Sequence, residues 1–470
     1  MGMERDNDFK SGLAGSRRAR PGGFKVEGDS RVNAVLGRSV LVAAVVGLLF
    51  GFDTAVIAGV THHITRVFAL SPSTLGFTVS IALWGTLIGA LGAGVPGDRF
   101  GARDGLKAMA LMYVVSALGC ALAVSWPMFL VFRLIGGLAI GGSSVLAPVY
   151  ISEIAPARRR GLLVGLFQFF IVAGILIAYC SNFAVGEAGL GALEWRAKLA
   201  APAAPAALVL ALLFAIPNSP RWLAGKGRDG EALAVLKTIG APEPQAELAA
   251  IDAAAAHDAA HAGQRLSWRL HARPIFLAVS IALFNQFAGI NAILYYLNDI
   301  FGYAGFGKVS SDLQSIAIGA TNLLFTVIAM SVIDRLGRKP LLLIGSVGMA
   351  LCLASAGLIL SGFGTKALLL PVLIGFIAFF AFSQGAVIWV YISEVFPSGV
   401  RSRGQSLGSA THWAANALIS GAFPLVAAHS RGAPFALFAA MMVVQFFVVL
   451  FVYPETRGVR LEDMAKTVNA

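Results

Sequence analysis

Long blocks of apolar residues alternate with short polar segments along most of the chain. A block of about 18 or more apolar residues is long enough to cross a bilayer as a helix. The blocks show no sustained alternation of period two and are too long for the strands of a membrane barrel. The pattern therefore predicts an all-α membrane protein with twelve transmembrane helices. Their predicted positions are 39-60, 74-95, 105-124, 127-150, 161-184, 197-216, 273-299, 313-333, 340-361, 367-393, 405-427 and 432-453.

Composition and charge agree with this interpretation. Of the 470 residues, 57% are hydrophobic and 13% are charged, whereas about 25% are charged in a soluble domain. The net charge is +12, but Lys and Arg gather in alternate loops, after the second, fourth, sixth, eighth and tenth blocks. Positive loops stay in the cytoplasm, so the charge predicts topology and does not indicate nucleic-acid binding. We expect a multi-pass protein of the inner (cytoplasmic) membrane with both termini in the cytoplasm.

The polar segments divide the chain into five parts. Residues 1-38 are polar and rich in Gly and Arg, and we expect a disordered cytoplasmic tail. Six-helix bundles are predicted at 39-216 and 273-453. Residues 217-272 form a charged, Ala-rich cytoplasmic linker in which "GEALAVLKTIG" and "QAELAAIDAAAAHDAAHA" predict short helices. Residues 454-470 form a cytoplasmic C-terminal tail.

The two predicted bundles share sequence landmarks. VYISE occurs at 149–153 and again at 390–394, and DRFG at 98–101 is echoed by DRLG at 334–337. Each landmark falls at the cytoplasmic end of the same span of its bundle, after a nearly constant offset. The chain is therefore predicted to contain two parallel repeats of six helices. This is a transporter architecture, with the substrate site near mid-membrane between the repeats.

Two charged residues lie deep inside predicted spans. They are Asp53, in "LLFGFDTAVIAG", and Arg133, in "FLVFRLIGGL". Counting at 1.5 Å per residue places both about 9–10 Å below the outer edge of the membrane. A charge at a helix centre costs about 2.5–3.5 kcal/mol, so matching depth and opposite sign predict an ion pair. Such residues mark ion or proton pathways; the alternative is a fixed ion pair without a transport role.

The motifs together resemble those of the sugar porters of the major facilitator superfamily. They cover the chain from the first span to residue 458. The motifs are "GDRFGARDG", "RLIGGLAIGG", "PVYISEIAPARRRG", "PNSPRWL", "NQFAGINAILYY", "DRLGRKP", "VYISEVFPSGVRSRG" and "PETRG". Proton-coupled sugar porters have an acid at the position of Asp53 and an arginine at that of Arg133, whereas passive facilitators have a neutral amide at the former. The resemblance thus implies secondary active transport of a hexose or pentose by proton symport with alternating access.

The same resemblance implies a cytoplasmic latch. A Glu at the membrane edge is costly unless it is paired, and Glu153 and Glu394 each end a span on the cytoplasmic side. Salt bridges from Arg99 or Arg103, and from Arg335 or Arg338, would close that side when the cavity opens outward. The predicted latch residues are Arg99, Arg103, Glu153, Arg160, Arg335, Arg338, Glu394 and Arg401. The alternative is that these charges are solvated topology signals. Ala102 stands where the family usually has a basic residue, which puts one bridge in doubt.

A neutral sugar needs amides that both donate and accept hydrogen bonds, and a flat aromatic wall. A helix break at Gly289 would let Gln286 and Asn291 converge, and Tyr295 shares a helix face with Asn291. Partly by transfer from the family, the predicted substrate-binding residues are Gln168, Gln286, Asn291, Tyr295, Asn322, Trp389, His412, Trp413 and Asn416. For any one amide the alternative is a hydrogen bond between helices, and for the tryptophans it is packing or interfacial anchoring. Three residues depart from the family pattern: Asn285, Ala386 and His412.

Three other functions agree less well with the sequence: an uncoupled facilitator, a sugar sensor and an enzyme. An uncoupled sugar facilitator disagrees with the acid at Asp53. A sugar sensor is expected to carry long cytoplasmic extensions, which are short here. The chain has no nucleotide loop, metal-ligand cluster or catalytic constellation, so we expect no enzyme activity, no metal and no cofactor. The expected partners are a monosaccharide, a proton and the lipid bilayer, with no nucleic acid, and the carrier is expected to work as a monomer. The sequence does not identify the sugar.

Overall fold

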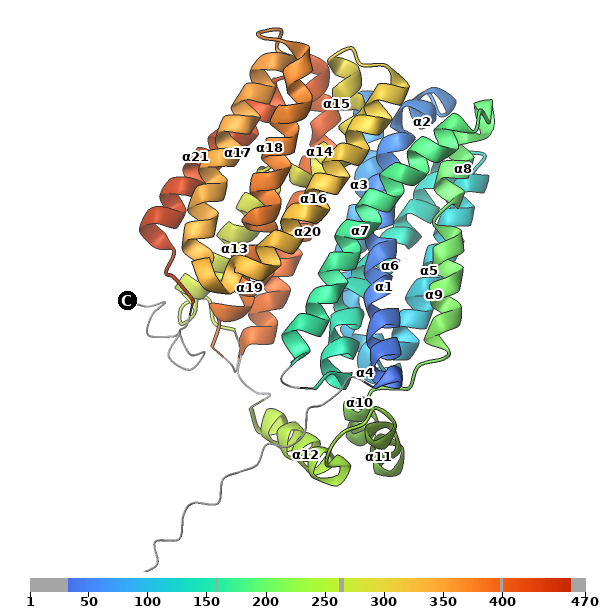
Figure 1. Ribbon diagram of the computed structural model, residues 1–470, viewed down its shortest axis with the longest axis vertical. Helices are drawn as coiled ribbons and strands as arrows, with labels where there is room; N and C mark the ends of the chain where they lie inside the picture. The colour runs from blue at the N-terminus through green and yellow to red at the C-terminus, as the bar shows by residue number, and fades with distance from the viewer. Residues whose placement is uncertain (1–32, 157–158, 262–265, 398–399, 458–470) are drawn as a thin grey trace, which may run out of the picture.

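The computed structural model describes residues 33–156, 159–261, 266–397 and 400–457. All regular structure in these ranges is helical (Figure 1). Residues 1–32 of the predicted N-terminal tail and most of the C-terminal tail lie outside the described residues. Residues 34–38, predicted as part of the disordered tail, are helical and begin the first span, whose apolar run extends towards the N-terminus through Val35 and Leu36. The spans that precede the linker form one group of helices and those that follow it form a second group beside the first (Figure 1). We call these groups the first half and the second half; the boundaries 39-216, 217-272 and 273-453 stay predictions.

The first half contains six spans. They are formed by α1 (Ala34–Val56) with η1 (Ile57–Gly59), α3 (Pro72–Gly92), α5 (Ala102–Leu122), α6 (Trp126–Ile154), α7 (Arg160–Glu187), and α8 (Glu194–Ala200) with α9 (Ala203–Leu213). Short helices α2 (Thr61–Val67), α4 (Gly94–Phe100) and η3 (Gly191–Leu193) lie at their ends.

The second half also contains six spans. They are formed by α13 (Ala272–Phe287) with α14 (Ile290–Tyr295) and α15 (Leu297–Tyr303), α16 (Lys308–Leu336), α17 (Arg338–Leu360), η4 (Lys366–Leu368) with α18 (Leu369–Phe382) and α19 (Gln384–Glu394), α20 (Arg401–His429), and α21 (Ala433–Val452).

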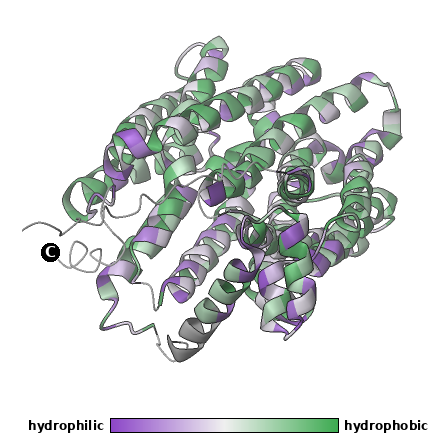
Figure 2. Ribbon diagram, turned by 60° about the horizontal axis from the view of Figure 1, so that its bottom comes forward, coloured by the Kyte–Doolittle hydropathy of each residue, from purple (hydrophilic) through white to green (hydrophobic). Residues whose placement is uncertain are grey.

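Eleven of these helical segments are long and apolar enough to cross a membrane by themselves. The twelfth span, α20, has 29 residues and is more polar than the others. It carries His412, Asn416 and Ser420, which are buried inside the protein. Hydrophobic residues cover most of the spanning helices (Figure 2), and large ones such as Phe451 are widely exposed. An apolar outer surface of this kind suits contact with lipid tails. The prediction of an all-α protein with twelve spans is confirmed.

Two spans of the second half are broken near their middle. Gly289, at φ 79°, separates α13 from α14 in the left-handed region that glycine adopts without strain. Ser383 separates α18 from α19. Residue 386 is Ala where the family pattern has Pro, and the helix is nonetheless interrupted three residues earlier. Both breaks place non-helical backbone inside the bundle, where protein groups can satisfy it.

The linker folds as three helices at one end of the bundle (Figure 1). They are α10 (Pro220–Gly225), α11 (Asp229–Thr238) and α12 (Pro244–His261). The helices predicted in this segment are therefore present. Their apolar residues join the hydrophobic core of the first half. Asn33, the N-cap of α1, also donates a hydrogen bond to the Thr238 carbonyl, so the linker is attached to the first half.

The sequence landmarks of the two halves make matching contacts. Tyr150, in the first VYISE, donates a hydrogen bond of 2.8 Å to the Pro217 carbonyl. Tyr391, in the second, donates one of 3.3 Å to the Pro454 carbonyl. In each half this bond ties the end of the fourth span to the segment that follows the sixth. The repeated sequence therefore makes the same contact in both halves.

Glycines bring two pairs of helices into close backbone contact in the first half. A β-carbon on Gly137 of α6 would lie 1.9 Å from the Ala82 carbonyl oxygen of α3. One on Gly51 of α1 would lie 1.8 Å from the Ile171 oxygen of α7. Small residues at such interfaces let helices pack closely within the membrane. We call these the α3–α6 pair and the α1–α7 pair.

Replacing Gly137 with Ala should destabilise the protein. The added methyl group would overlap the α3 backbone, and overpacking of this kind costs about 1–3 kcal/mol. Gly92→Ala, at the end of α3, is the matched control because a β-carbon there meets nothing within 4 Å. Thermal unfolding in detergent should show a lower midpoint for Gly137→Ala alone. Equal midpoints for the two variants would contradict the close packing of the α3–α6 pair.

Candidate functional site

The two charges predicted deep inside the spans form an ion pair. Arg133 Nη1 lies 3.0 Å from Asp53 Oδ1 and 3.1 Å from Asp53 Oδ2. The Arg133 side chain is 4% exposed and that of Asp53 13%. The pair joins α6 to α1, and the Nε of Arg133 is buried without a hydrogen-bond partner. Arg133 therefore keeps one donor available for a further acceptor.

A small pocket adjoins this ion pair. It is lined by Asp53 and Arg133 together with Tyr295 of α14 and Trp413 of α20. Its volume is about 10 Å³, which is the space of about one water molecule by the same measure. The pocket places two residues of the predicted sugar site beside the predicted proton site. The halves are thus closely packed around this point.

A polar network centres on Gln286, the last polar residue of α13. Its Nε2 lies 3.0 Å from Asn285 Oδ1 and 3.1 Å from a ring nitrogen of His412. Its Oε1 accepts a hydrogen bond of 3.0 Å from Asn291, across the break at Gly289. The break therefore brings Gln286 and Asn291 together, as predicted from the sequence. Three amides and an imidazole meet at one point between α13, α14 and α20.

Aromatic rings enclose His412. Its ring centroid lies 4.9 Å from that of Trp389 and 5.0 Å from that of Trp413. Trp389 is 38% exposed, whereas His412 and Trp413 are 7% and 6% exposed. His412 is thus part of the polar network and not an isolated packed side chain. Trp389 contacts the imidazole that bonds Gln286 and keeps part of its aromatic surface exposed.

Tyr295 connects the network to Asn416. Asn416 Nδ2 lies 3.5 Å from the Tyr295 hydroxyl, and Asn416 Oδ1 accepts a hydrogen bond from Ser420. Two other predicted residues lie outside this set of contacts. Gln168 is half-buried on α7 and Asn322 is 7% exposed on α16, and within the described ranges neither shares a hydrogen bond with the network. Their assignment to the sugar site stays a prediction.

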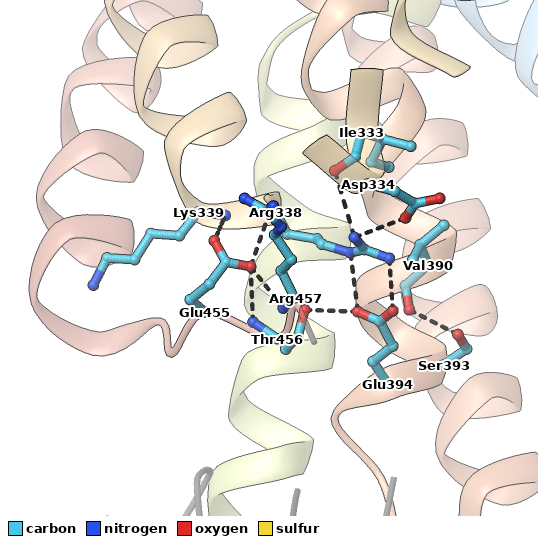
Figure 3. Close-up of polar contacts among 10 residues, drawn as sticks. All are labelled: Ile333, Asp334, Arg338, Lys339, Val390, Ser393, Glu394, Glu455, Thr456 and Arg457. Carbon is cyan, nitrogen blue, oxygen red and sulfur yellow. Dashed lines mark hydrogen bonds and ion pairs between the residues drawn. The ribbon is translucent and has the colours of Figure 1, made fainter. Parts of the chain in front are cut away.

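Two of the predicted latch residues, Arg338 and Glu394, belong to one polar network in the second half (Figure 3). Arg338 binds both carboxylate oxygens of Glu394, with Nη2 to Oε1 at 2.8 Å and Nε to Oε2 at 3.2 Å. Thr456 donates its hydroxyl to the same carboxylate. Glu455 accepts hydrogen bonds from the backbone N–H groups of Arg338 and Lys339 at the start of α17. A carboxylate is stabilised at a helix N-terminus by the helix dipole and the free N–H groups.

The corresponding network in the first half has a different set of contacts. Arg103 pairs with Asp104 at 3.0 Å and donates to the Ile216 carbonyl, so it does not pair with Glu153 in this structure. The reason is positional, because the residue that follows the glycine of the repeat is Arg338 in the second half and Ala102 in the first. Glu153 interacts with Ser219 and Arg221 instead. The departure noted at Ala102 therefore removes one salt bridge of the predicted latch.

Within the described ranges, neither Arg99 nor Arg335 forms an ion pair with Glu153 or Glu394. Arg99 is exposed and stacks over the Phe100 ring, with 5.2 Å between its guanidinium carbon and the ring centroid. Arg335 is exposed at the end of α16. Arg160 and Arg401 begin α7 and α20, next to residues outside the described ranges. A latch role for these four arginines stays a prediction.

Two polar groups escaped the sequence analysis. Gln384 and Gln445 are both buried and hydrogen-bonded to each other between α19 and α21. At the end of the bundle opposite the linker, Lys198 and Asp312 are buried inside segments otherwise rich in apolar residues. The sequence could have indicated Lys198 and Asp312, because charges within apolar segments are costly unless paired. Both Lys198 and Asp312 stand close to the end of a predicted span, where a charge can also reach the membrane interface.

The chain is similar in sequence to proteins described as sugar transporters. A sequence model of the family described as "Sugar (and other) transporter" matches residues 39–467. The D-xylose-proton symporter of Escherichia coli (strain K12) is 36% identical over 465 residues, covering 90% of this chain and 94% of the relative. The arabinose-proton symporter of Bacillus subtilis (strain 168) is 35% identical over 427 residues, covering 89% and 92%.

Solved structures with a similar fold include two of the xylose transporter XylE of Escherichia coli. The inward-open conformation has a TM-score of 0.82 at 34% identity, covering 92% of this chain and 99% of that one. The proton:xylose symporter XylE bound to 6-bromo-6-deoxy-D-glucose has a TM-score of 0.76 at 35% identity, covering 92% and 98%.

Introducing the missing arginine should strengthen the first-half network. In Ala102→Arg the new guanidinium would stand where Arg338 stands in the second half, within reach of Glu153. A double-mutant cycle with Glu153→Gln should give a stabilising coupling of about 0.5–3 kcal/mol in thermal unfolding. Ala102→Arg alone should raise the midpoint, and the rise should vanish in the Glu153→Gln background. A rise of the same size in both backgrounds would show that the arginine does not act through Glu153.

Proposed function

The chain belongs to the sugar (and other) transporter family, the sugar porters of the major facilitator superfamily, and we propose that it carries a monosaccharide across the membrane together with a proton. The proposal is for a secondary transporter and not for an enzyme. The relatives named as D-xylose-proton and arabinose-proton symporters support a pentose or hexose as substrate. The observation that carries the proposal is the buried Asp53–Arg133 ion pair beside the central pocket.

Asp53 is the proposed proton carrier. With Asp53 ionised, Arg133 is neutralised and α1 is held to α6. Protonation of Asp53 removes the attraction and leaves Arg133 as a buried cation, which needs a new acceptor because an uncompensated buried charge is strongly unfavourable. The loaded carrier therefore prefers a different arrangement of helices from the empty, deprotonated one. A movement of Arg133 relative to Asp53 changes the proton affinity in turn, since a neighbouring cation favours the ionised carboxyl.

The proposed sugar site is the network of Gln286, Asn291 and His412 with the wall of Trp389. In the present structure these polar groups satisfy one another, which keeps them hydrogen-bonded when no sugar is bound. A sugar hydroxyl can replace any of these partners because amides and a neutral imidazole both donate and accept. Tyr295 and Trp413, which line the pocket at Asp53, connect this site to the proton site. Gln168 and Asn322 are proposed to approach the sugar when the halves rearrange.

The orientation follows from charge. Arginines of the DRFG and DRLG motifs, and those that follow each VYISE in the sequence, mark one side of the membrane, and positive residues stay in the cytoplasm. We therefore assign the linker end and both termini to the cytoplasm, and the opposite end to the outside, in the inner (cytoplasmic) membrane. The likeness to the inward-open conformation of the relative supports an inward-facing arrangement of this structure, with its outer end closed. A single chain contains the whole proposed site, so the proposed carrier acts as a monomer.

Asp53→Asn tests the coupling. The amide keeps the size of the carboxyl but does not titrate, so concentrative uptake driven by an imposed pH gradient in proteoliposomes should be abolished. Exchange of sugar between equal pools should survive because it requires no net proton movement. Radiolabelled D-xylose and L-arabinose are the first substrates to compare, each measured with and without the gradient. Concentrative uptake by Asp53→Asn would refute the assignment and leave an uncoupled facilitator or another proton site.

Gln286→Ala tests the sugar site independently. Removing the amide leaves a sugar hydroxyl unmatched, so binding should weaken by about 1–3 kcal/mol in calorimetry on the detergent-solubilised protein. Gln445→Ala is the matched control, because it deletes a buried amide that bonds Gln384 outside the network. Binding should be unchanged in the control. Unchanged binding in Gln286→Ala would exclude this side chain from the sugar site.

A further inference from the structure

A second group of buried charges lies at the outer end of the bundle. It consists of Glu194, Lys198, His63, Lys308 and Asp312, which we call the outer cluster. Glu194, Lys198 and Asp312 are 5%, 1% and 4% exposed. None of these residues takes part in the proposed sugar or proton sites, and a buried charge demands a partner.

Glu194 is the centre of the outer cluster. Its Oε1 lies 2.7 Å from Lys198 Nζ, one helical turn away on α8. Its Oε2 is within hydrogen-bond distance of Lys308 Nζ, at the start of α16, and 3.9 Å from His63 Nε2 on α2. Glu194, Lys198 and His63 belong to the first half, whereas Lys308 belongs to the second. The Glu194–Lys308 ion pair therefore crosses from one half to the other.

Asp312 adds a second charge from α16. Asn298 of α15 donates a hydrogen bond to it, and Lys198 is the strongest of the charged groups acting on it. The geometry at Gly186 of α7 shows how closely these groups converge. A β-carbon on that glycine would lie 3.6 Å from Asp312 Oδ2 and 3.8 Å from both Glu194 Oε1 and Lys198 Nζ. Charged atoms from α8 and α16 thus surround one point at the end of α7.

The outer cluster is electrically balanced. Two carboxylates face two ammonium groups, and Lys198 also donates to the Gly59 carbonyl. Burial lowers the pKa of His63, an effect that Glu194 opposes and that Lys198, Lys308 and His62 reinforce. His63 is therefore neutral at neutral pH and leaves the balance intact. A neutral set of opposite charges is stable in a buried place only while its members stay together.

Other contacts at this end show that the halves meet there. Tyr179 of α7 donates a hydrogen bond of 3.0 Å to the Leu294 carbonyl of α14. A β-carbon on Gly76 of α3 would lie 2.0 Å from the Gly421 carbonyl oxygen of α20. Among the described residues, the ion pair that joins the two halves is at this end, whereas the network of Glu394 lies within the second half. The Glu194–Lys308 ion pair thus links the halves at the outer end.

We propose that the outer cluster is an electrostatic lock that holds the outer end of the carrier closed. The Glu194–Lys308 pair, with Lys198 and Asp312 beside it, stabilises the arrangement in which the halves touch. Opening of the outer end separates the charges of α8 from those of α16 and returns them to water. The lock is the outer counterpart of the cytoplasmic latch, and it rests on the proposed function only in that the chain alternates between two arrangements.

Lys308→Gln is the sharpest test. The Lys308 side chain is 50% exposed, so its replacement removes the link between the halves while leaving the buried Glu194–Lys198 pair in place. Spin labels at Leu190→Cys and Phe363→Cys, two exposed positions in outer loops of the first and second half, report their separation by pulsed electron paramagnetic resonance. The background carries Ala at Cys120, Cys180 and Cys352, and the protein is reconstituted without sugar or a pH gradient.

The ratio of outer-open to outer-closed carriers should rise about two- to fivefold in Lys308→Gln, the range expected for a partly exposed ion pair. Glu194→Gln should raise it more than tenfold, because it leaves Lys198 without its partner in the closed state. Lys308→Arg should restore the parent distribution. Glu187→Gln, which removes an exposed carboxylate from the end of α7, should change nothing.

The lock is overturned if Lys308→Gln and Glu194→Gln both give the distance distribution of Glu187→Gln. Should Glu194→Gln not fold, Lys308→Gln and its Arg control decide alone. The outcome is independent of the substrate and of coupling, because neither sugar nor a gradient is present. A shifted distribution in a protein that fails to concentrate sugar would leave the lock standing and refute the proposed symport.

Discussion

Every charge within a bilayer must find its partner inside the protein, and this constraint explains most of the polar detail of the structure. Asp53 and Arg133 bind each other inside the helix bundle. Lys198, which is 1% exposed, binds Glu194. Both pairs are largely buried, so separating their members costs far more than it would on a soluble surface. Pairs that are expensive to separate suit a carrier, because protonation or movement of one partner changes the preferred arrangement of whole helices.

The two halves share a sequence repeat but differ in charge. In the second half Arg338, Glu394, Thr456 and Glu455 form one network at the ends of three helices. In the first half the matching positions carry Ala102 in place of Arg338 and Asn218 in place of Glu455. Ser219 stands at the position of Thr456 in the repeat, and its hydroxyl accepts a hydrogen bond from the Trp222 N–H at the start of α10. The linker helices pack on the first half, and Asn33 at the start of α1 donates a hydrogen bond to the Thr238 carbonyl at the end of α11.

The sequence predicted most of the fold because a bilayer leaves few choices. Apolar length located the spans, and depth along the helices paired Asp53 with Arg133. The break at Gly289 was predictable from a glycine between two amides. Side-chain partners at the membrane edge were less predictable, because an arginine there can reach several acceptors. Arg103, for example, binds Asp104 and the Ile216 carbonyl. Contacts between distant segments, such as that of Glu194 with Lys308, depend on how the two halves pack together. Local sequence patterns do not predict this packing.

The close glycine contacts of the first half give the Asp53–Arg133 bond a mechanical meaning. Asp53 stands on α1, which is held to α7 at Gly51, and Arg133 stands on α6, which is held to α3 at Gly137. The ion pair thus bridges the α1–α7 pair and the α3–α6 pair. Backbones in such close contact resist sliding, so the softer direction of motion lies between the two helix pairs and not within them. Protonation or deprotonation of Asp53 then acts on the interface between the α1–α7 pair and the α3–α6 pair. A hinge motion at this interface requires no helix to bend.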